Sequence, residues 1–356
     1  SCAFVATDCV TIYVPQQIIL FDQDSWWGVS SYLDPDVETV PEVMEPIVVD
    51  PIDATGSRHL VIQIDKAGKY YWPEPVPAIN QLGNWLPLPD ELPIGYKAKI
   101  KYSPACLPIY GDTLVENTFE ISGAFTYVPV LTNVNVNILD LFGPDTANIL
   151  LIYDWVSQDA WFPDVLDQLT EFTPGKAYLL VNRDPFVAPY TVDFPDYDPD
   201  VTFVTGALAG GEAGNNSPWN DVENTALPHF LMFADQVLAE MQPGDIIGAF
   251  NQYDECVGMT EFADRDAFFK VVAMGDDPLT QAIDGFETNE FMNFKLYRQA
   301  TAETFDVSFT YDASYPNYNG LYAVNGVSKV VNMTMSITGV NNDINTNYNV
   351  NVFPNP

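Results

Sequence analysis

The run Asn148-Ile149-Leu150-Leu151-Ile152-Tyr153 decides how this sequence is interpreted. It is short, apolar and rich in branched side chains, which is typical of a buried β-strand. A matching run, His59-Leu60-Val61-Ile62-Gln63-Ile64, lies earlier in the chain. Each run is followed by an aromatic–proline element, Tyr70-Tyr71-Trp72-Pro73 in the first case and Ala160-Trp161-Phe162-Pro163 in the second. The repetition predicts two copies of one β-rich unit.

Other landmarks recur around these runs in the same order. Each copy opens on a strand-like segment (Trp26 to Leu33, then Phe125 to Leu131) and closes on another (Ile94 to Ile100, then Pro174 to Val181). The short stretches 38–44 and 138–142 are expected to form one or two helical turns. We therefore predict an N-terminal segment at residues 1–12, β-rich module 1 at residues 13–110, and its repeat, module 2, at residues 118–192.

The amino-acid composition and the predicted elements change after residue 192. Residues 193–217 are rich in Asp, Gly and Asn, which indicates an acidic linker. Residues 218–338 contain strand candidates at turn-separated intervals and predict an antiparallel β-sandwich. These candidates are 230–233, 245–250, 267–273, 291–297, 304–310 and 329–337. The predicted fold class is all-β with minor helical turns: tandem β-rich modules, a β-sandwich, and an Asn-rich end at 339–356.

The sequence is strongly acidic. It has 13 Lys and Arg and 49 Asp and Glu, which give a net charge of −36. Phosphate backbones and anionic membrane surfaces would be repelled, so neither nucleic acid nor membrane is an expected partner. Three interpretations stay open: solubility in salty water, binding of divalent cations, and binding of a basic partner. No run of 18 apolar residues is present, so membrane insertion is not expected.

Catalytic signatures are absent from the sequence. There is no GxSxG, HExxH, phosphate-binding loop or dinucleotide-binding motif. The two histidines, His59 and His229, are far apart and offer little for a zinc site or a Ser–His pair. Two acids at the right separation would suffice for a glycoside hydrolase, but no pair stands out among the 49. We expect no enzyme and assign no catalytic residue.

Two acidic loops are candidates for Ca²⁺, the one cofactor we consider. Carboxylates at alternating positions on a turn-rich loop provide the hard oxygen ligands that Ca²⁺ prefers, although neither loop has the EF-hand pattern. The alternative in both cases is a solvated acidic loop. The candidate ligands are Asp193, Asp196, Asp198 and Asp200 in the first loop, and Asp276, Asp277 and Asp284 in the second.

Aromatic residues of module 1 are candidates for stacking on sugar rings, which many saccharide-binding sites use beside hydrogen bonds to hydroxyls. The alternative is that they fill the core, as their recurrence in both copies suggests. Consecutive aromatics on a strand point to opposite faces, so 70–72 cannot all be buried on one side. The candidates are Trp26, Trp27, Tyr71, Trp72 and Trp85.

The chain has four cysteines and no CxxC motif. Cys2 and Cys9 are close enough to close a small loop, while Cys106 and Cys256 could form a longer bridge or remain single. An even number suits a secreted protein, but the pairing does not follow from the sequence.

The end of the chain, Val350-Asn351-Val352-Phe353-Pro354-Asn355-Pro356 after an Asn-rich stretch, resembles the start of a type IX secretion sorting domain of Bacteroidota. The segment Trp27-Gly28-Val29-Ser30-Ser31-Tyr32 and its neighbours resemble modules of large secreted proteins of that phylum, as do residues 243–335. The resemblance implies export across the outer membrane and exposure at the cell surface. It also implies O-glycosylation at Asp-Thr-Leu and Asp-Thr-Ala sites, here Thr113 and Thr146.

We therefore expect a secreted structural or adhesive protein, such as a subunit of an extracellular filament or matrix. It would self-associate or bind other surface proteins through β-strand contacts. A strand such as Ala3 to Val14 or Tyr348 to Phe353 would complete a neighbour's open sheet edge. The alternative is a carbohydrate-binding accessory module with glycans as partners, and the second alternative is an acid-pair glycoside hydrolase.

Overall fold

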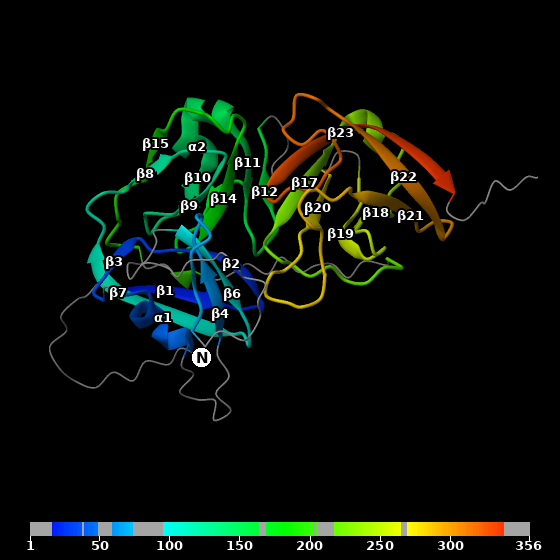
Figure 1. Cartoon of the computed structure of the whole chain (residues 1–356). Helices are drawn as coiled ribbons and strands as arrows, with labels where there is room; N and C mark the ends of the chain where they lie inside the picture. Colours follow the sequence, from blue (N-terminus) through cyan, green and yellow to red (C-terminus); the bar gives the residue numbers. More distant parts are fainter. Residues whose placement is uncertain are drawn as a thin grey trace, which may run out of the picture.

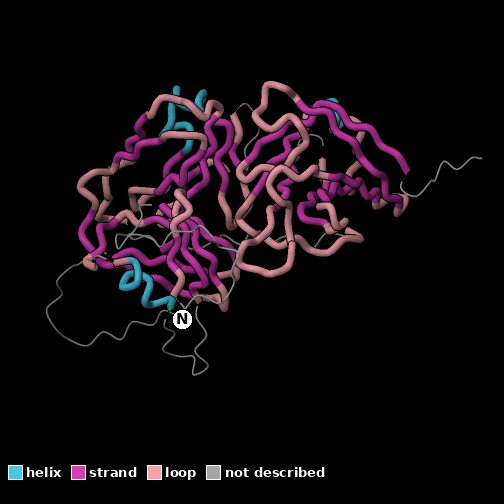
Figure 2. Tube along the Cα trace, in the orientation of Figure 1, coloured by secondary structure: helices cyan, strands magenta, loops and turns pink. Residues whose placement is uncertain are grey.

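The computed structural model of the chain describes residues 16–37, 39–48, 59–73, 95–163, 169–201, 204–205, 217–264 and 269–337. Strands dominate these residues, and the helices among them are short (Figure 2). The chain is therefore all-β with minor helical turns, as the sequence predicts. Within the described ranges, no helix is long and apolar enough to cross a membrane.

The first part of the chain forms two four-stranded sheets that share one core (Figure 1). One sheet has the order β2 (Ser25–Ser30), β6 (Gly95–Ile100), β4 (Leu60–Ile64), β5 (Tyr70–Tyr71). The other has the order β16 (Val204–Thr205), β1 (Gln16–Phe21), β7 (Ala105–Thr113), β3 (Leu33–Pro35). Alternate residues of each strand, such as Ile19 and Ala98, meet between them, and helix α1 (Val40–Val48) adds its apolar side.

The second part repeats the first sheet. Its four strands have the order β9 (Phe125–Pro129), β14 (Ala177–Asn182), β11 (Ile149–Tyr153), β12 (Ala160–Trp161). One face packs against α2 (Ile138–Phe142) and two small antiparallel pairs, and the 3-10 helix η2 (Gly143–Asn148) connects α2 to β11. These pairs are β8 (Thr118–Ile121) with β15 (Tyr190–Asp193), and β10 (Val136–Asn137) with β13 (Glu171–Phe172).

The two repeated sheets correspond strand for strand and register for register. Val29 pairs with Tyr96 across β2 and β6, and at the equivalent position Val128 pairs with Tyr178 across β9 and β14. The opening strand of each copy lies beside the closing strand of the other, β2 beside β14 and β9 beside β6. The approach is close: Ser30 N–H donates to the carbonyl of Gly175 at 3.0 Å. The copies therefore pack as a pseudo-twofold pair within one chain.

The last part of the chain is a single seven-stranded sheet and not the two-sheet sandwich that the sequence suggested. Its order is β19 (Cys256–Glu261), β18 (Asp245–Phe250), β21 (Asn293–Arg298), β22 (Glu303–Tyr311), β23 (Gly326–Ile337), β17 (Pro228–Phe233), β20 (Lys270–Met274). All neighbours are antiparallel except β17 and β23. The sheet curls until its edges meet, because Gly258 lets β19 approach β20: a Cβ there would lie 2.5 Å from the carbonyl oxygen of Val272. Helix α3 (Asp235–Leu238) adds to its core.

All three parts meet in one apolar cluster, which we call the shared core. It takes side chains from both repeated sheets and from β17, β20 and β23, which lie next to β11 and β12 in Figure 1. The rings of Tyr153 and Phe230 meet across this junction with centroids 4.8 Å apart. Its members include Trp26, Ile62, Tyr127, Tyr153, Trp155, Leu179, Phe230, Met232, Val272 and Val327.

Part of the segment expected to be a linker belongs to the fold. Asp193 ends β15, and Val204 and Thr205 pair in parallel with Ile18 and Ile19 of β1. Between them, the amide of Asn133 donates to the carbonyls of Asp198 and Val201 at 2.6 and 2.8 Å. These contacts fasten the acidic stretch to the body of the molecule.

Candidate functional site

Strand β6 carries two lysines on one face of its sheet. Lys97 and Lys99 are two residues apart and so point to the same side, where they flank the ring of Trp26 in β2. Their Nζ atoms lie 5.0 and 5.8 Å from the Trp26 ring centroid. This face belongs to the shared core, so both ammonium groups are directed into the junction with the last part of the chain.

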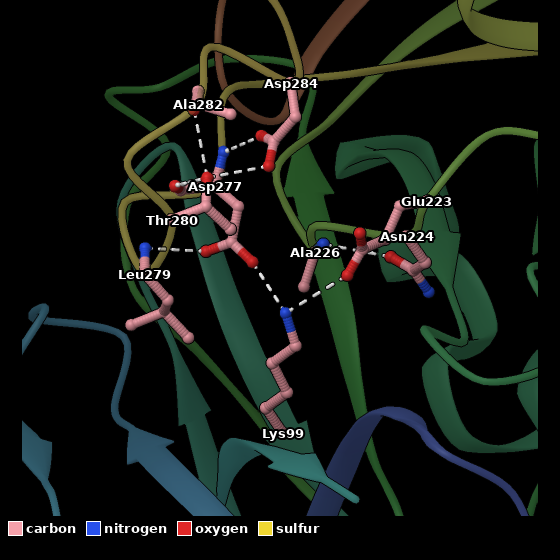
Figure 3. A network of polar contacts seen from close by, with 9 residues as sticks. All are labelled: Lys99, Glu223, Asn224, Ala226, Asp277, Leu279, Thr280, Ala282 and Asp284. Carbon is pink, nitrogen blue, oxygen red and sulfur yellow. Dashed lines mark hydrogen bonds and ion pairs between the residues drawn. The ribbon is translucent and has the colours of Figure 1, made fainter.

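The loop of residues 275–286, which we call the aspartate loop, faces Lys99 (Figure 3). A bridge between Gly275 and Phe286 closes its base. Inside the loop, Asp284 accepts hydrogen bonds from the N–H of Asp277 at 2.9 Å and from the hydroxyl of Thr280 at 2.7 Å. The Asp277 carboxylate in turn accepts the N–H of Leu279 at 2.9 Å. The loop is therefore shaped by its own carboxylates.

A buried ion pair joins strand and loop. Nζ of Lys99 lies 2.6 Å from Oδ2 of Asp277, whose side chain is fully buried, and 3.4 Å from Oε1 of the more exposed Glu223. Lys97 donates to the carbonyl of Ala226 at 2.9 Å. Since buried charges are costly unless paired, these contacts hold the aspartate loop and the segment before β17 against module 1.

The electrostatics of the junction agree with this geometry. Burial lowers the pKa of Lys99, but the charge and hydrogen bond of Asp277 outweigh it, so the pKa lies above its ordinary value. For Lys97 burial dominates and lowers the pKa to about 8, although the charge of Asp277 acts in the opposite direction. The pKa of Asp276 is raised, chiefly by burial and also by Asp284 and Asp277. The arrangement can clamp two parts of the chain together.

The candidate calcium ligands are used in other ways. Asp277 binds Lys99, while Asp276 accepts the N–H of Asp284 at 2.9 Å. In the other loop, Asp196 accepts from Asn117 at 3.2 Å and Asp198 accepts the N–H of Asp200 at 2.9 Å, while Asp193 is exposed in β15. Among the described residues, no three Asp, Glu, His or Cys side chains gather into a group that could hold a metal ion. The structure does not bring either set together as ligands.

The candidate sugar-stacking residues that the structure describes lie largely in the cores, which is the alternative that the sequence left open. Trp26 and Trp27 are 1 % and 0 % exposed, because successive residues of β2 point to the two buried faces of the sheet. Tyr71 and Trp72 are half-buried and pack against the module 1 core and the shared core, respectively. Trp85 lies outside the described residues.

The cysteines do not form the longer bridge that the sequence allowed. Cys106 in β7 is disulfide-bonded, whereas Cys256 is a free thiol. Burial raises the pKa of the Cys256 thiol to about 11, so little of it is thiolate near neutral pH. Cys2 and Cys9 lie outside the described residues. Of the two candidate glycosylation sites, Thr113 ends β7, and the hydroxyl of Thr146 donates to the carbonyl of Gly143 at 2.8 Å.

The one fully buried histidine has a structural environment. Ser328 donates its hydroxyl hydrogen to the carbonyl of Asn317 and so accepts from Nε2–H of His229, 2.9 Å away. Nδ1 of His229 then accepts the N–H of Ala323 at 3.1 Å. Burial lowers the pKa of His229 to about 4, which keeps the ring neutral. Among the described residues, the hydrogen-bond partners of the ring are thus Ser328 and Ala323.

Sequence reasoning missed two features. The alternation of Lys97 and Lys99 in β6 was visible, and two like charges on one face of a predicted inner strand signal a buried acidic partner. Trp219 was also missed because it lies in a short loop next to the segment predicted to be a linker. It is half-buried on Gly248, where a Cβ would lie 2.7 Å from its ring, and its ring lies edge-on to Phe250 and Tyr297.

Comparison with known proteins adds no relative. No family model matches the chain, and no curated protein or solved structure is significantly similar to it. The function must therefore be argued from the residues themselves.

Proposed function

We propose that this protein is a secreted cell-surface structural or adhesive protein, a subunit that assembles through β-strand contacts. The proposal of export rests on the resemblance of residues 350–356 to the start of a sorting domain; these residues lie outside the described part of the chain. The proposal of a structural role rests on the shared core. Two repeats and a curled sheet bury one continuous apolar cluster, and the Lys99–Asp277 pair fastens its rim.

The chemistry of the potentially reactive groups supports this role over catalysis. His229 is neutral and fully hydrogen-bonded, the Cys256 thiol is held protonated, and Lys176 is committed to Asp154 at 2.7 Å. A rigid body that uses its polar side chains internally is suited to carrying load or presenting surfaces.

The edge of β1 supports strand addition as the mode of assembly. Ile18 stands opposite Pro108, which has no N–H, so this is a non-hydrogen-bonded pair and the polar backbone groups of Ile18 point to the other edge. By alternation those of Gln16 and Leu20 point there as well. Among the described residues, β16 pairs with Ile18 and Ile19 of β1. Under the proposal, a strand from a second copy adds to this side of the sheet.

Electron microscopy of the purified chain, with and without dithiothreitol, tests the proposal. We expect polymers in at least one condition, and their loss on deletion of residues 1–14 or in Leu20→Pro, which removes the N–H that Leu20 directs away from β7. The control Leu20→Ala keeps that N–H and should still assemble. Monomers in both conditions, or filaments unchanged by the deletion, would refute the proposal.

A carbohydrate-binding role is the second candidate, and the Trp219 patch favours it. This patch comprises Trp219 and Tyr297, with Lys295 paired to Asp254 beside Phe250, and the 57 % exposed Tyr253 directly precedes Asp254 in the chain. Partly exposed rings next to charged hydrogen-bonding groups are what a saccharide site requires. A glycan array decides: saturable binding that is lost in Trp219→Ala favours this candidate, and an array without binding removes it.

A further inference from the structure

The amine of Lys99 and the carboxyl group of Asp277 meet where water is largely excluded. Nζ of Lys99 lies 2.6 Å from Oδ2 of Asp277, and the two side chains are 10 % and 0 % exposed. Lys99 is the register partner of Ile62 in β4, and its Nζ is 5.8 Å from the ring centroid of Trp26. A primary amine and a carboxyl group in direct contact are the two reactants from which an amide bond forms.

The carboxyl carbon of Asp277 is presented to this amine. Oδ2 is bonded to Cγ, so Nζ lies within about 4 Å of Cγ, near the separation at which positioned groups react. The other oxygen, Oδ1, accepts the N–H of Leu279 at 2.9 Å, and such a donor stabilises negative charge that develops on the oxygen. Asp284 holds this turn in place, because it accepts the N–H of Asp277 and the hydroxyl of Thr280. The amine, the carbon and the N–H donor are therefore preorganised.

A second carboxylate contacts the same amine. Oε1 of Glu223 lies 3.4 Å from Nζ of Lys99, so the nitrogen stands between two carboxylates (Figure 3). A carboxylate in contact with an attacking nitrogen can take a proton from it and pass that proton to the leaving group. Another buried pair, Lys176 with Asp154 at 2.7 Å, has this one carboxylate contact among the described residues. The second carboxylate distinguishes Lys99 from Lys176.

We propose that Lys99 and Asp277 condense to an amide, which cross-links β6 to the aspartate loop within one chain. One proton first moves from the Lys99 ammonium to Oδ2 of Asp277, which leaves a neutral amine and a neutral carboxylic acid. Nζ then bonds to Cγ, and Oδ1 takes up the negative charge beside the N–H of Leu279. Glu223 accepts a proton from the nitrogen and returns it to Oδ2, the bond between Cγ and Oδ2 breaks, and one water leaves. No oxidant, reductant or co-reactant is consumed.

Burial favours this reaction at its start and at its end. An ion pair in an apolar site has lost the hydration of both charges, so the neutral amine and acid are accessible from it. The raised pKa of Lys99 agrees with this, because the proton stays on the pair and moves only between its two members. The product is a neutral amide, and the exclusion of water from the site protects it from hydrolysis.

The cross-link joins module 1 covalently to the last sheet, across 178 positions of the chain. It would make their junction resistant to separation even when the shared core is weakened. The bond forms within one chain, so it goes beyond the proposed assembly and does not depend on it.

Intact mass and peptide mapping of the reduced recombinant chain test the proposal. The chain should be lighter than its sequence by the mass of one water. Trypsin does not cut after a lysine whose amine is in an amide, so residues 98–101 should be found joined to residues 271–295. Lys99→Arg keeps a cation beside Asp277 but offers no amine, and it should have its full mass. The matched control Lys176→Arg should lack one water, as the unchanged chain does.

The results that contradict the proposal are equally specific. A full mass for the unchanged chain would overturn the cross-link. So would a missing water that is confined to residues 271–295, as cyclisation of Asp284 onto Gly285 would give, or one that joins Lys176 to Asp154. Glu223→Gln should reach the lighter mass roughly tenfold or more slowly, because the proton carrier is lost. An equal rate would overturn the role assigned to Glu223.

Discussion

Nζ of Lys99 in β6 lies 2.6 Å from Oδ2 of Asp277 in the aspartate loop, although the two residues are 178 positions apart in the chain. The pair joins a strand of module 1 to the curled sheet that ends the described chain. Its two side chains are 10 % and 0 % exposed, so water does not screen the contact. The parts of this molecule are thus coupled by a charge pair at the rim of their shared apolar core.

Removal of either partner should destabilise the fold strongly. Lys99→Met leaves the Asp277 carboxylate buried without its cation, and Asp277→Asn leaves Lys99 without its main anion. We expect each to lower the free energy of unfolding by about 3–5 kcal/mol. Urea denaturation at neutral pH measures the change.

The double variant separates pairing from packing. If the cost of each single change is the stranded charge, Lys99→Met with Asp277→Asn should cost clearly less than the sum of the two. Strictly additive losses would mean that the ion pair does not couple the residues. Glu223→Gln is the matched control: its carboxylate is mostly exposed, so a change below about 1 kcal/mol is expected.

His229 should make the protein sensitive to mild acid. Its pKa of about 4 in the fold is below the ordinary value of 6.5, so the unfolded chain takes up a proton at a higher pH than the folded one. This contribution to stability is present above pH 6.5 and is lost as the pH falls through 4, and it amounts to roughly 3 kcal/mol in total. Urea denaturation at pH 7 and 4.5 should show the loss.

The variant His229→Asn isolates this effect from the titration of the carboxylates. It should be less stable at pH 7, because the hydrogen bonds to Ser328 and Ala323 are disturbed. Its stability should nevertheless fall less between pH 7 and 4.5 than that of the unchanged chain. An equal fall in both proteins would show that His229 titrates normally.

The repeat was accessible from the sequence because its strands keep their order and side-chain spacing. The runs at 59–64 and 148–153 became β4 and β11, at the same place in sheets of the same order. Alternation also placed Tyr70 and Tyr71 on opposite faces, against the shared core and the module 1 core. The alternation of side chains along a strand predicts which residues share a face, because it depends only on the local backbone geometry.

The residues that pack against a given sheet face cannot be predicted from the local spacing of side chains. Nothing in the spacing of Lys97 and Lys99 names Asp277, which reaches them only when the last sheet packs on module 1. Strand β19 was missed because Gly258 interrupts its pattern, yet that glycine is what lets the curled sheet close on Val272. Strand β16 was missed for a related reason: two residues pair with β1 inside a segment with linker composition.

Gly28 should be intolerant of a side chain because the repeats meet at its Cα. A Cβ there would lie 1.8 Å from the carbonyl oxygen of Ala177 and 2.7 Å from Cε3 of Trp155. We expect Gly28→Ala to cost about 3 kcal/mol or more, as the two sheets must separate. Gly68→Ala, with φ +76° and no atom within 4 Å, should cost only about 1 kcal/mol. Similar losses in thermal unfolding would contradict the close packing of the repeats.

Truncation of Trp26 and of Trp219 should lower the free energy of unfolding by different amounts. The difference tests which of the two rings stabilises the fold. Trp26 is 1 % exposed between two lysines in the shared core, so Trp26→Ala should lower the free energy of unfolding by about 3–5 kcal/mol. Trp219 rests half-buried on the outside of β18, and Trp219→Ala should cost clearly less because water already reaches its ring. Urea denaturation ranks the two variants. If Trp219→Ala lowers the free energy of unfolding more than Trp26→Ala does, the Trp219 ring serves to pack over Gly248. That result would argue against a saccharide site at the Trp219 patch.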